Sequence, residues 1–282
     1  MTFTLLAPAT GEEAVAALLA AGPGELAVLA GGTDLLPDID EGRTAPRRVL
    51  SLRRLPWREL NWTSTELEVG ALVPLASLER NAELRRRMPG LFEAVGAVGG
   101  LALRHRATLG GNLVRASPVS DLIPILLALE ARVGLYGAQG ERELPLEEFL
   151  QSPRRTSLAP GELLRRVRIP ARPCAFRWQR VRPANDISQL AVAVAYDPLG
   201  GDWRVATAGV APLARRAPGA EAALHGVAPS DAEIRACADV AAHEAPVRAD
   251  RRATDPYRRL LLRALVARAV RAVRDRPLES SS

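Results

Sequence analysis

The pattern of apolar residues changes at two prolines, Pro170 and Pro173, and this change limits the chain to few folds. Three apolar runs follow the prolines, at residues 174–182, 187–196 and 203–211. A turn signal, Asp-Pro-Leu-Gly-Gly, separates the last two runs, so the pattern predicts a three-stranded antiparallel meander. Three helical patterns come next, near residues 218–224, 230–242 and 256–275. Strands followed by helices indicate an α+β module, here a three-stranded sheet with a three-helix bundle.

The first half alternates between short apolar runs and helical patterns. It predicts strands, the first of them buried, at residues 25–30, 49–52, 67–71, 133–136 and 163–169. It predicts helices at residues 10–21, 75–85, 89–99 and 119–130. Thr10 is placed to cap the first helix, and Pro89 suits the first turn of the third. We divide the chain into residues 1–171, split again near residue 55, and residues 172–282.

Composition narrows the functional classes. The 282 residues are 48% hydrophobic, which is enough for two buried cores. The net charge is +6 without any lysine, which suits binding of nucleic acid or of an acidic partner, or else codon bias and solvated, arginine-rich helix faces. Because only 4% of residues are aromatic, a stacking platform for nucleic acid is not expected.

Metal-binding and targeting signals are not evident in the sequence. Two distant cysteines and three isolated histidines predict no metal site in this chain. We find no signal peptide and no apolar run near the roughly 20 residues needed to span a bilayer, so we expect a cytoplasmic protein.

The first candidate site follows the apolar run at residues 25–30. Two glycines, Gly31 and Gly32, precede Thr33 and Asp34. Consecutive glycines can point several backbone N–H groups into one concavity that fits a phosphate, and Thr33 would add a hydroxyl. The motif is neither a Walker loop nor a Rossmann fingerprint. A plain turn is the alternative explanation for this glycine pair taken alone.

A second glycine pair, Gly110 and Gly111, lies between Thr108 and Asn112. We expect a loop here, with positive φ at Gly111 and close approach of a ligand. Asp121 could accept hydrogen bonds from hydroxyls or an amine, or it could complement the dipole of the helix that follows. Two separate glycine pairs suit a long, bent dinucleotide, with one pair at its pyrophosphate and the other at the rest.

These motifs resemble those of the FAD-binding subunit of the xanthine dehydrogenase and carbon monoxide dehydrogenase family of molybdenum hydroxylases. In that family AGGxxLLP precedes TxGGN and a segment similar to SPxxDL. The resemblance covers nearly the whole chain, with further matching blocks at residues 160–170, 185–187, 209–212, 257–259 and 268–269. Thr33 and Ala107 depart from the family, where glutamine and glycine are frequent.

The resemblance implies an α+β fold: a two-part FAD-binding domain of the vanillyl-alcohol-oxidase-like type, then the C-terminal module. It implies noncovalent FAD, with the pyrophosphate wrapped by Ala30, Gly31, Gly32, Thr33, Asp34 and Leu35. Thr108, Gly110, Gly111 and Asn112 would form the second loop, with Leu109 near the isoalloxazine. Asp121 would bind the ribose and adenine side, Leu164 would line the cofactor, and Arg104 stands where a basic residue is frequent.

The resemblance also implies a role in electron transfer. Electrons would come from a small partner subunit with [2Fe-2S] clusters, which receives them from a large molybdopterin-binding subunit. They would leave to NAD⁺, a quinone or oxygen. A flavin supplies this chemistry itself, so no catalytic residue is predicted. The alternative is a self-contained FAD-dependent oxidoreductase, but many of these tether the flavin to His or Cys beside the first loop, where this chain has neither.

Overall fold

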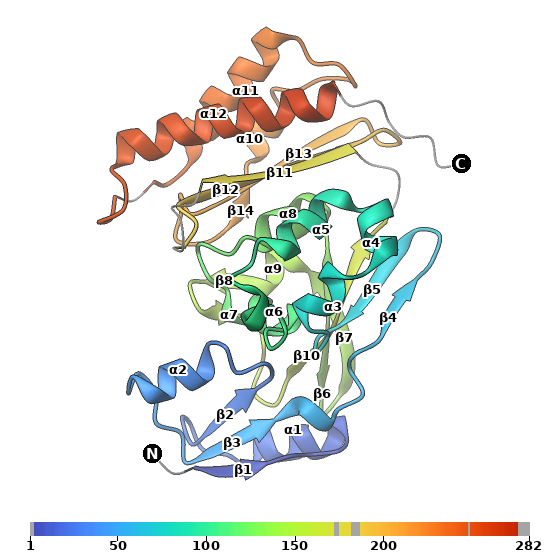
Figure 1. Ribbon diagram of the computed structural model, residues 1–282, viewed down its shortest axis with the longest axis vertical. Helices are drawn as coiled ribbons and strands as arrows, with labels where there is room; N and C mark the ends of the chain where they lie inside the picture. The colour runs from blue at the N-terminus through green and yellow to red at the C-terminus, as the bar shows by residue number, and fades with distance from the viewer. Residues whose placement is uncertain (1–2, 172–174, 182–186, 248, 276–282) are drawn as a thin grey trace.

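The computed structural model describes residues 3–171, 175–181, 187–247 and 249–275, and the side chains of residues 175–179 are outside this description. Three parts follow one another along the long axis of the molecule (Figure 1). The N-terminal part ends at Arg54, the middle part runs from Leu60 to Pro170, and the C-terminal part starts at Ala175.

The N-terminal part is a parallel sheet with two helices. Its strand order is β1 (Thr4–Leu6), β3 (Arg48–Ser51) and β2 (Leu26–Leu29), accompanied by α1 (Gly11–Leu19), α2 (Leu35–Asp40) and the 3-10 turn η1 (Leu52–Arg54). The predicted cap of α1 is confirmed, because Thr10 Oγ1 accepts a hydrogen bond from Glu13 N at 3.2 Å. The prediction that the first strand is buried is wrong: Val28 in β2 is 38% exposed, since it lines an open cavity.

The middle part is built on a five-stranded antiparallel sheet. The strand order is β4 (Leu60–Trp62), β5 (Glu66–Gly70), β10 (Leu163–Pro170), β6 (Arg132–Gly137) and β7 (Gly140–Pro145). Helices, and the hairpin of β8 and β9, cover one face: α3 (Leu75–Glu79), α4 (Ala82–Arg87), α5 (Pro89–Gly96), α6 (Leu101–Arg104), α7 (Leu109–Arg115), α8 (Ile123–Ala128), α9 (Leu146–Phe149), β8 (Leu150–Ser152) and β9 (Arg155–Thr156).

Two of the predicted helices in this part differ from the structure. The helix expected at residues 75–85 is divided into α3 and α4, because Asn81 Oδ1 accepts a hydrogen bond from Leu84 N at 2.6 Å and starts a new helix. The helix expected at residues 119–130 starts only at Ile123.

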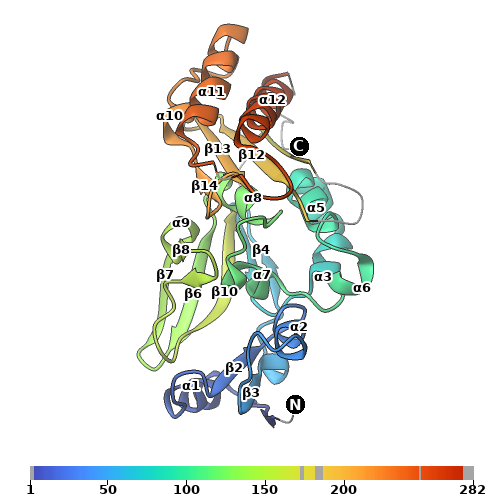
Figure 2. The same ribbon diagram turned by 90° about the vertical axis from the view of Figure 1, so that its left-hand side faces the viewer.

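The C-terminal part has the predicted meander, β11 (Ala175–Val181), β12 (Leu190–Asp197) and β13 (Asp202–Ala208). The sheet is not three-stranded, however, because β14 (Arg215–Arg216) pairs with β13. Two arginines are too short and too polar a segment to give a strand pattern. The helices are α10 (Pro218–Glu221), α11 (Asp231–Glu244) and α12 (Asp255–Arg274), and the two long ones cover the outer face of the sheet (Figure 2).

Strand β12 is buried on both faces, and its alternating sequence explains how the parts join. The larger side chains, Leu190, Val192 and Val194, pack into a core with α11 and α12. The small side chains on the other face, Ala191, Ala193 and Ala195, pack into the core of the middle part, next to α8. This close contact places the C-terminal sheet directly behind the segment that precedes α8.

Candidate functional site

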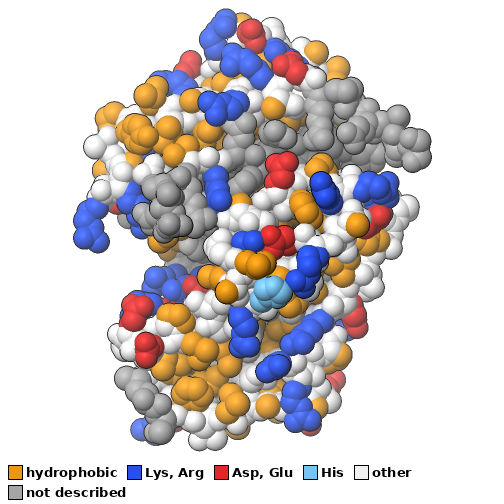
Figure 3. Space-filling model, viewed as in Figure 1, with side chains coloured by type: hydrophobic (Ala, Val, Ile, Leu, Met, Phe, Trp, Pro, Cys, Tyr) orange, Lys and Arg blue, Asp and Glu red, His pale blue; other side chains and the backbone are white. Residues whose placement is uncertain are grey.

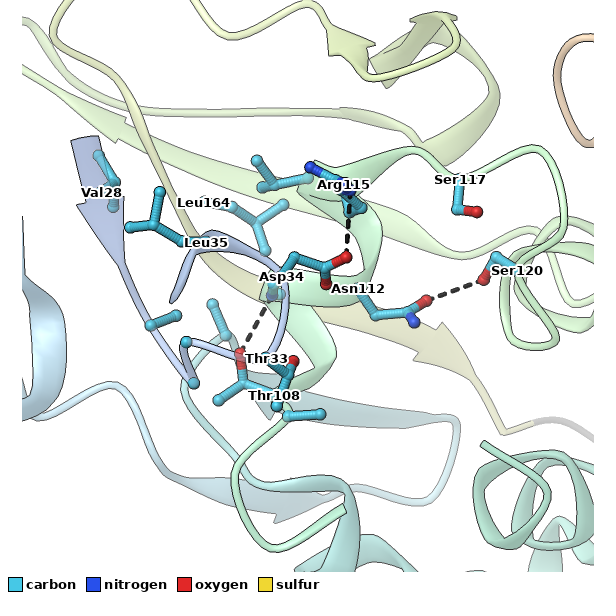
Figure 4. A pocket seen from close by; sticks show the side chains of 18 of the residues that line it. Val28, Thr33, Asp34, Leu35, Thr108, Asn112, Arg115, Ser117, Ser120 and Leu164 are labelled. Atoms are coloured by element: carbon cyan, nitrogen blue, oxygen red, sulfur yellow. Dashed lines mark hydrogen bonds and ion pairs between the residues drawn. The ribbon is translucent and has the colours of Figure 1, made fainter. Parts of the chain in front are cut away.

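A cavity of about 530 Å³ lies where the N-terminal and middle parts meet. This volume is within the roughly 300–1,000 Å³ of small-molecule and cofactor sites. Its walls include nearly all the predicted site residues: Ala30, Gly31, Gly32, Thr33, Asp34, Leu35, Thr108, Gly110, Gly111, Asn112, Asp121 and Leu164. Figure 4 shows how several of them face one another. Leu109 is the exception: its side chain is 1% exposed and packs in the core of the middle part.

The first glycine motif forms a turn whose backbone N–H groups have no acceptor in the part of the chain that the structure describes. Gly32 has φ of +83°, whereas Asp34 lies in the right-handed helical region. Among the described residues, none accepts a hydrogen bond from the N–H of residues 31–35, and regular bonding starts with Leu36 N to Gly32 O at 3.1 Å. Successive N–H groups in such a turn form a concavity that binds anions. This turn therefore fits a phosphate group.

The second glycine motif is the start of helix α7, and the prediction of a loop there is wrong. Thr108 caps the helix, with its Oγ1 accepting a hydrogen bond from Gly111 N at 3.1 Å. The next N–H groups are also bonded, Leu109 N to Val73 O at 3.1 Å and Gly110 N to Ala71 O at 3.0 Å. Gly111 is helical and does not have the positive φ that we expected. The motif therefore presents to the cavity a helix surface without side chains at its glycines, and its backbone N–H groups are hydrogen-bonded within the protein.

Three of the four glycines, Gly31, Gly110 and Gly111, differ in what an added methyl group would meet. At Gly31 it would collide with the backbone carbonyl of Arg106, so this glycine lets the first motif pack against the second. At Gly110 it would lie 2.6 Å from Ala71 Cβ and 2.8 Å from Leu164 Cδ2. At Gly111 it would lie 3.0 Å from Thr108 Oγ1 and 3.9 Å from Ala30 Cβ. Gly111 therefore leaves a space in the cavity wall that a ligand can fill.

An arginine that the sequence did not single out joins the two motifs. Arg115, in the last turn of α7, pairs through Nε with Asp34 Oδ1 at 3.1 Å and through Nη1 with Asp38 Oδ2 at 2.7 Å (Figure 4 draws the first pair). Arg43 also pairs with Asp38, at 2.5 Å. The hydrogen bond from Arg115 is the main cause that holds the pKa of Asp38 below its ordinary value. These pairs fix the first turn against α7.

Arg104, predicted as the basic residue before the second motif, is buried and holds another wall. Its guanidinium binds both carboxylate oxygens of Glu79, at 2.7 and 2.6 Å. It also donates to the carbonyls of Val98 and Gly99, at 3.1 and 3.2 Å, and these two residues line the cavity. The bond with Arg104 is the main cause of the lowered pKa of Glu79. Arg104 therefore shapes the wall from behind.

The segment before α8 completes the cavity. Ser120 Oγ donates to Asn112 Oδ1 at 2.9 Å and accepts from Leu122 N and Ile123 N, each at 3.3 Å. Ser120, and not Asp121, therefore satisfies the first N–H groups of this helix. Asp121 faces the C-terminal part, where its carboxylate binds Ser188 Oγ and Arg180 Nη1 at 2.6 and 2.8 Å.

The described residues show no group of three or more His, Cys, Asp or Glu side chains that could hold a metal ion. Cys237 is fully buried, and desolvation raises the pKa of its thiol to about 12, so it is a poor nucleophile. Cys174 lies outside the described residues, as do Asn185 and Asp186 of one family-like block. No helix in the part of the chain that the structure describes is long and apolar enough to cross a membrane.

Comparisons with known proteins identify two domain families in this chain. Residues 1–172 match the family described as FAD binding domain in molybdopterin dehydrogenase, and residues 175–273 match the CO dehydrogenase flavoprotein C-terminal domain. The carbon monoxide dehydrogenase medium chain of Hydrogenophaga pseudoflava is 28% identical over 277 residues, 96% of each chain. The 6-hydroxypseudooxynicotine dehydrogenase complex subunit alpha of Paenarthrobacter nicotinovorans is 33% identical over 157 residues, which span 55% of this chain and about half (53%) of that subunit.

A solved structure of carbon monoxide dehydrogenase from Hydrogenophaga pseudoflava superposes with a TM-score of 0.91 at 29% identity, covering 97% of both chains. The matched families together cover both the cavity-forming parts and the C-terminal part, in the order that the sequence motifs predicted. The chain therefore belongs to the FAD-binding medium subunits of the xanthine dehydrogenase and carbon monoxide dehydrogenase family of molybdenum hydroxylases, which are oxidoreductases.

Proposed function

We propose that this chain binds FAD noncovalently in the cavity between its N-terminal and middle parts and serves its complex as an electron carrier. Electrons would arrive from [2Fe-2S] clusters on a small partner subunit, which are reduced by a molybdenum cofactor on a large subunit. They would leave to NAD⁺, a quinone or oxygen. Bound FAD supplies the redox chemistry, and the protein supplies binding, orientation and electrostatics.

The row of N–H groups at residues 31–35, for which the described residues supply no acceptor, carries this proposal. These groups, with the Thr33 hydroxyl, would hold the pyrophosphate. Gly111 would leave room for the cofactor, and Leu35 and Leu164 would give it apolar contact. We keep Asp121 on the ribose and adenine side. Because Leu109 is buried, we assign it to packing beneath α7 and no longer to contact with the ring.

Exposed apolar residues at the cavity support docking of a partner there. Val28 and Leu103 both line the cavity and are each 38% exposed, and Leu101 in the same helix as Leu103 is 60% exposed. On the face shown in Figure 3, apolar side chains gather over the N-terminal part, beside arginines. Apolar surface rimmed by charge is typical of protein interfaces. We expect the partner that delivers electrons to cover this region.

The domain boundary at residues 171 and 172, and the split near residue 55, remain proposals. Separate apolar cores support the split: Ala14, Leu50 and Trp57 pack in one, and the helices of the middle part pack in another. The cytoplasm remains the compartment predicted from the sequence.

The test is steady-state turnover of candidate substrates by the purified chain with FAD, compared with the co-expressed three-subunit complex. We expect hydroxylation by the complex alone, and at most weak NADH or dye oxidoreductase activity by the single chain. Robust hydroxylation by the single chain without molybdenum would overturn the proposal and favour a self-contained flavoenzyme. Gly111→Val in the complex is the matched variant, because it should remove flavin and turnover together.

A further inference from the structure

The C-terminal part holds one wall of the cavity in place. Residues 117–121 supply Ser117, Val119, Ser120 and Asp121 to the cavity lining, and the C-terminal part binds this segment at Pro118 and Asp121. Gly209 N, just after β13, donates to Pro118 O at 2.8 Å. Ser188 Oγ, just before β12, donates to Asp121 Oδ1 at 2.6 Å, and Arg180 Nη1 of β11 donates to Asp121 Oδ2 at 2.8 Å.

Arg180 also reaches a second wall of the same cavity. Its Nη1 donates to Ala97 O at 2.9 Å, at the end of α5. The next two residues, Val98 and Gly99, line the cavity, and their carbonyls are held by Arg104. One guanidinium nitrogen of Arg180 therefore connects two wall segments that are separate in the sequence.

The holding groups are themselves fixed from behind by helix α12. Arg258 is 3% exposed, donates to Gln189 O at 3.0 Å and to Gly209 O, and pairs with Asp250 at 2.7 Å. Gln189 adjoins Ser188, and Gly209 is the residue that binds Pro118. Arg258 therefore holds in place the backbone at Gln189 and Gly209, next to the residues that bind the wall.

The ion pair between Arg180 and Asp121 should affect how well the cavity binds FAD. The Asp121 side chain is only 11% exposed, and Arg180 pairs with it. Arg180 places a positive charge beside this carboxylate, in the wall of a cavity that would receive an anionic pyrophosphate, so its loss would make the wall more negative and disfavour an anion there. We propose that Arg180 and Ser188, although outside the FAD-binding domain, are positioning residues of the cofactor site that orient Asp121 and, through Arg180, balance its charge. This inference rests on the proposed function.

The test is the dissociation constant of FAD, measured by flavin fluorescence on the full chain freed of cofactor. Arg180→Met should weaken binding about tenfold or more, the effect expected from losing one charge-assisted hydrogen bond. Arg204→Met is the matched control: Arg204 in β13 pairs with Glu130 at 2.8 Å between the same two parts, and neither residue lines the FAD cavity. The control should lower the melting temperature and leave the FAD constant unchanged.

Further variants separate positioning from general loss of structure. Arg180→Lys should restore part of the affinity, and Arg180→Met should have a smaller effect when Asp121→Asn is already present. Ser188→Ala, a milder change, should weaken FAD several-fold and decides the matter if Arg180→Met fails to fold. Equal affinities of wild type, Arg180→Met and Ser188→Ala would overturn the inference, as would equal losses in Arg180→Met and Arg204→Met. A wild-type chain that does not bind FAD would instead overturn the proposed function.

Discussion

Adding the same methyl group to the adjacent glycines Gly110 and Gly111 should affect different properties: stability at Gly110 and FAD affinity at Gly111. At Gly110 the new Cβ would lie 2.6 Å from Ala71 Cβ, 2.7 Å from Ala71 O and 2.8 Å from Leu164 Cδ2. Overpacking of this kind costs about 1–3 kcal/mol, and the better helix propensity of alanine offsets up to about 1 kcal/mol. Neither Ala71 Cβ nor the Ala71 carbonyl is the end of a flexible side chain, so the cost lies near the top of this range, and Gly110→Ala should lower the free energy of unfolding by about 2 kcal/mol.

At Gly111 the new Cβ meets only Thr108 Oγ1 closely, at 3.0 Å, and otherwise points into the cavity. A small shift of that hydroxyl offsets the helix-propensity gain of about 1 kcal/mol, so the free energy of unfolding should change by less than about 1 kcal/mol. The methyl group would take space from the cofactor, and we expect FAD affinity to fall about tenfold, or about 1.4 kcal/mol. Gly111→Val should abolish binding through its volume, since Gly111 has no positive φ to strain.

The assay combines urea unfolding of the cofactor-free variants, followed by circular dichroism, with titration of FAD. The reasoning predicts a crossed result, in which Gly110→Ala is less stable and Gly111→Ala binds FAD poorly at normal stability. A Gly111→Ala variant that binds FAD as tightly as wild type would refute the assignment of Gly111 to the cofactor surface. Equal destabilisation by both substitutions would show that the two glycines serve packing alike.

Three other predictions concern the same cavity. FAD at about 100 times its dissociation constant should stabilise the fold by about 2.7 kcal/mol and raise the melting temperature, while NAD⁺ and ATP should not; no shift with FAD would count against the site. Asp121→Ala should weaken FAD more than FMN, and equal losses would show that Asp121 does not serve the adenosine half. Because Arg115 holds the pKa of Asp38 low in the folded chain, Asp38 should stabilise the fold fully above the unfolded pKa of about 3.9 and lose this effect as pH falls through its folded pKa. Asp38→Asn should therefore lower the melting temperature at pH 7 and flatten its decline in acid, and an unchanged acid profile would contradict this account.

Features governed by neighbouring residues could be predicted from the sequence. Thr10 and the acidic residues after it mark the start of α1, because a cap acts within three residues. The alternation in β12 predicts a strand, because side chains on a strand repeat every two residues. The same alternation also indicates how the parts pack, since the alanine face of β12 lies against α8 and its larger side chains pack against α11 and α12.

Contacts between distant segments could not be predicted in this way. Arg115 and Asp38 lie 77 positions apart, and Arg180 and Asp121 lie 59 apart, so no local spacing connects them. Arginine is the chain's only long cationic residue and occurs throughout the sequence. Composition therefore gave no reason to choose Arg115, Arg180 or Arg258 over the many arginines on the surface.

The glycine pairs show why a correct set of residues can still have incorrect roles. Sequence reasoning treated both pairs as loops that approach a ligand, but only Gly32 has positive φ, and only Gly111 leaves open space. Gly31 and Gly110 are required by packing of one protein segment on another, which has the same signature in a sequence as close approach to a cofactor. Leu109 was included because the family resemblance implied a place near the isoalloxazine, although helical geometry turns its side chain into the core. Residue types in a motif thus indicated where a ligand would bind, and only the three-dimensional packing separates the residues that meet it from those that hold the motif together.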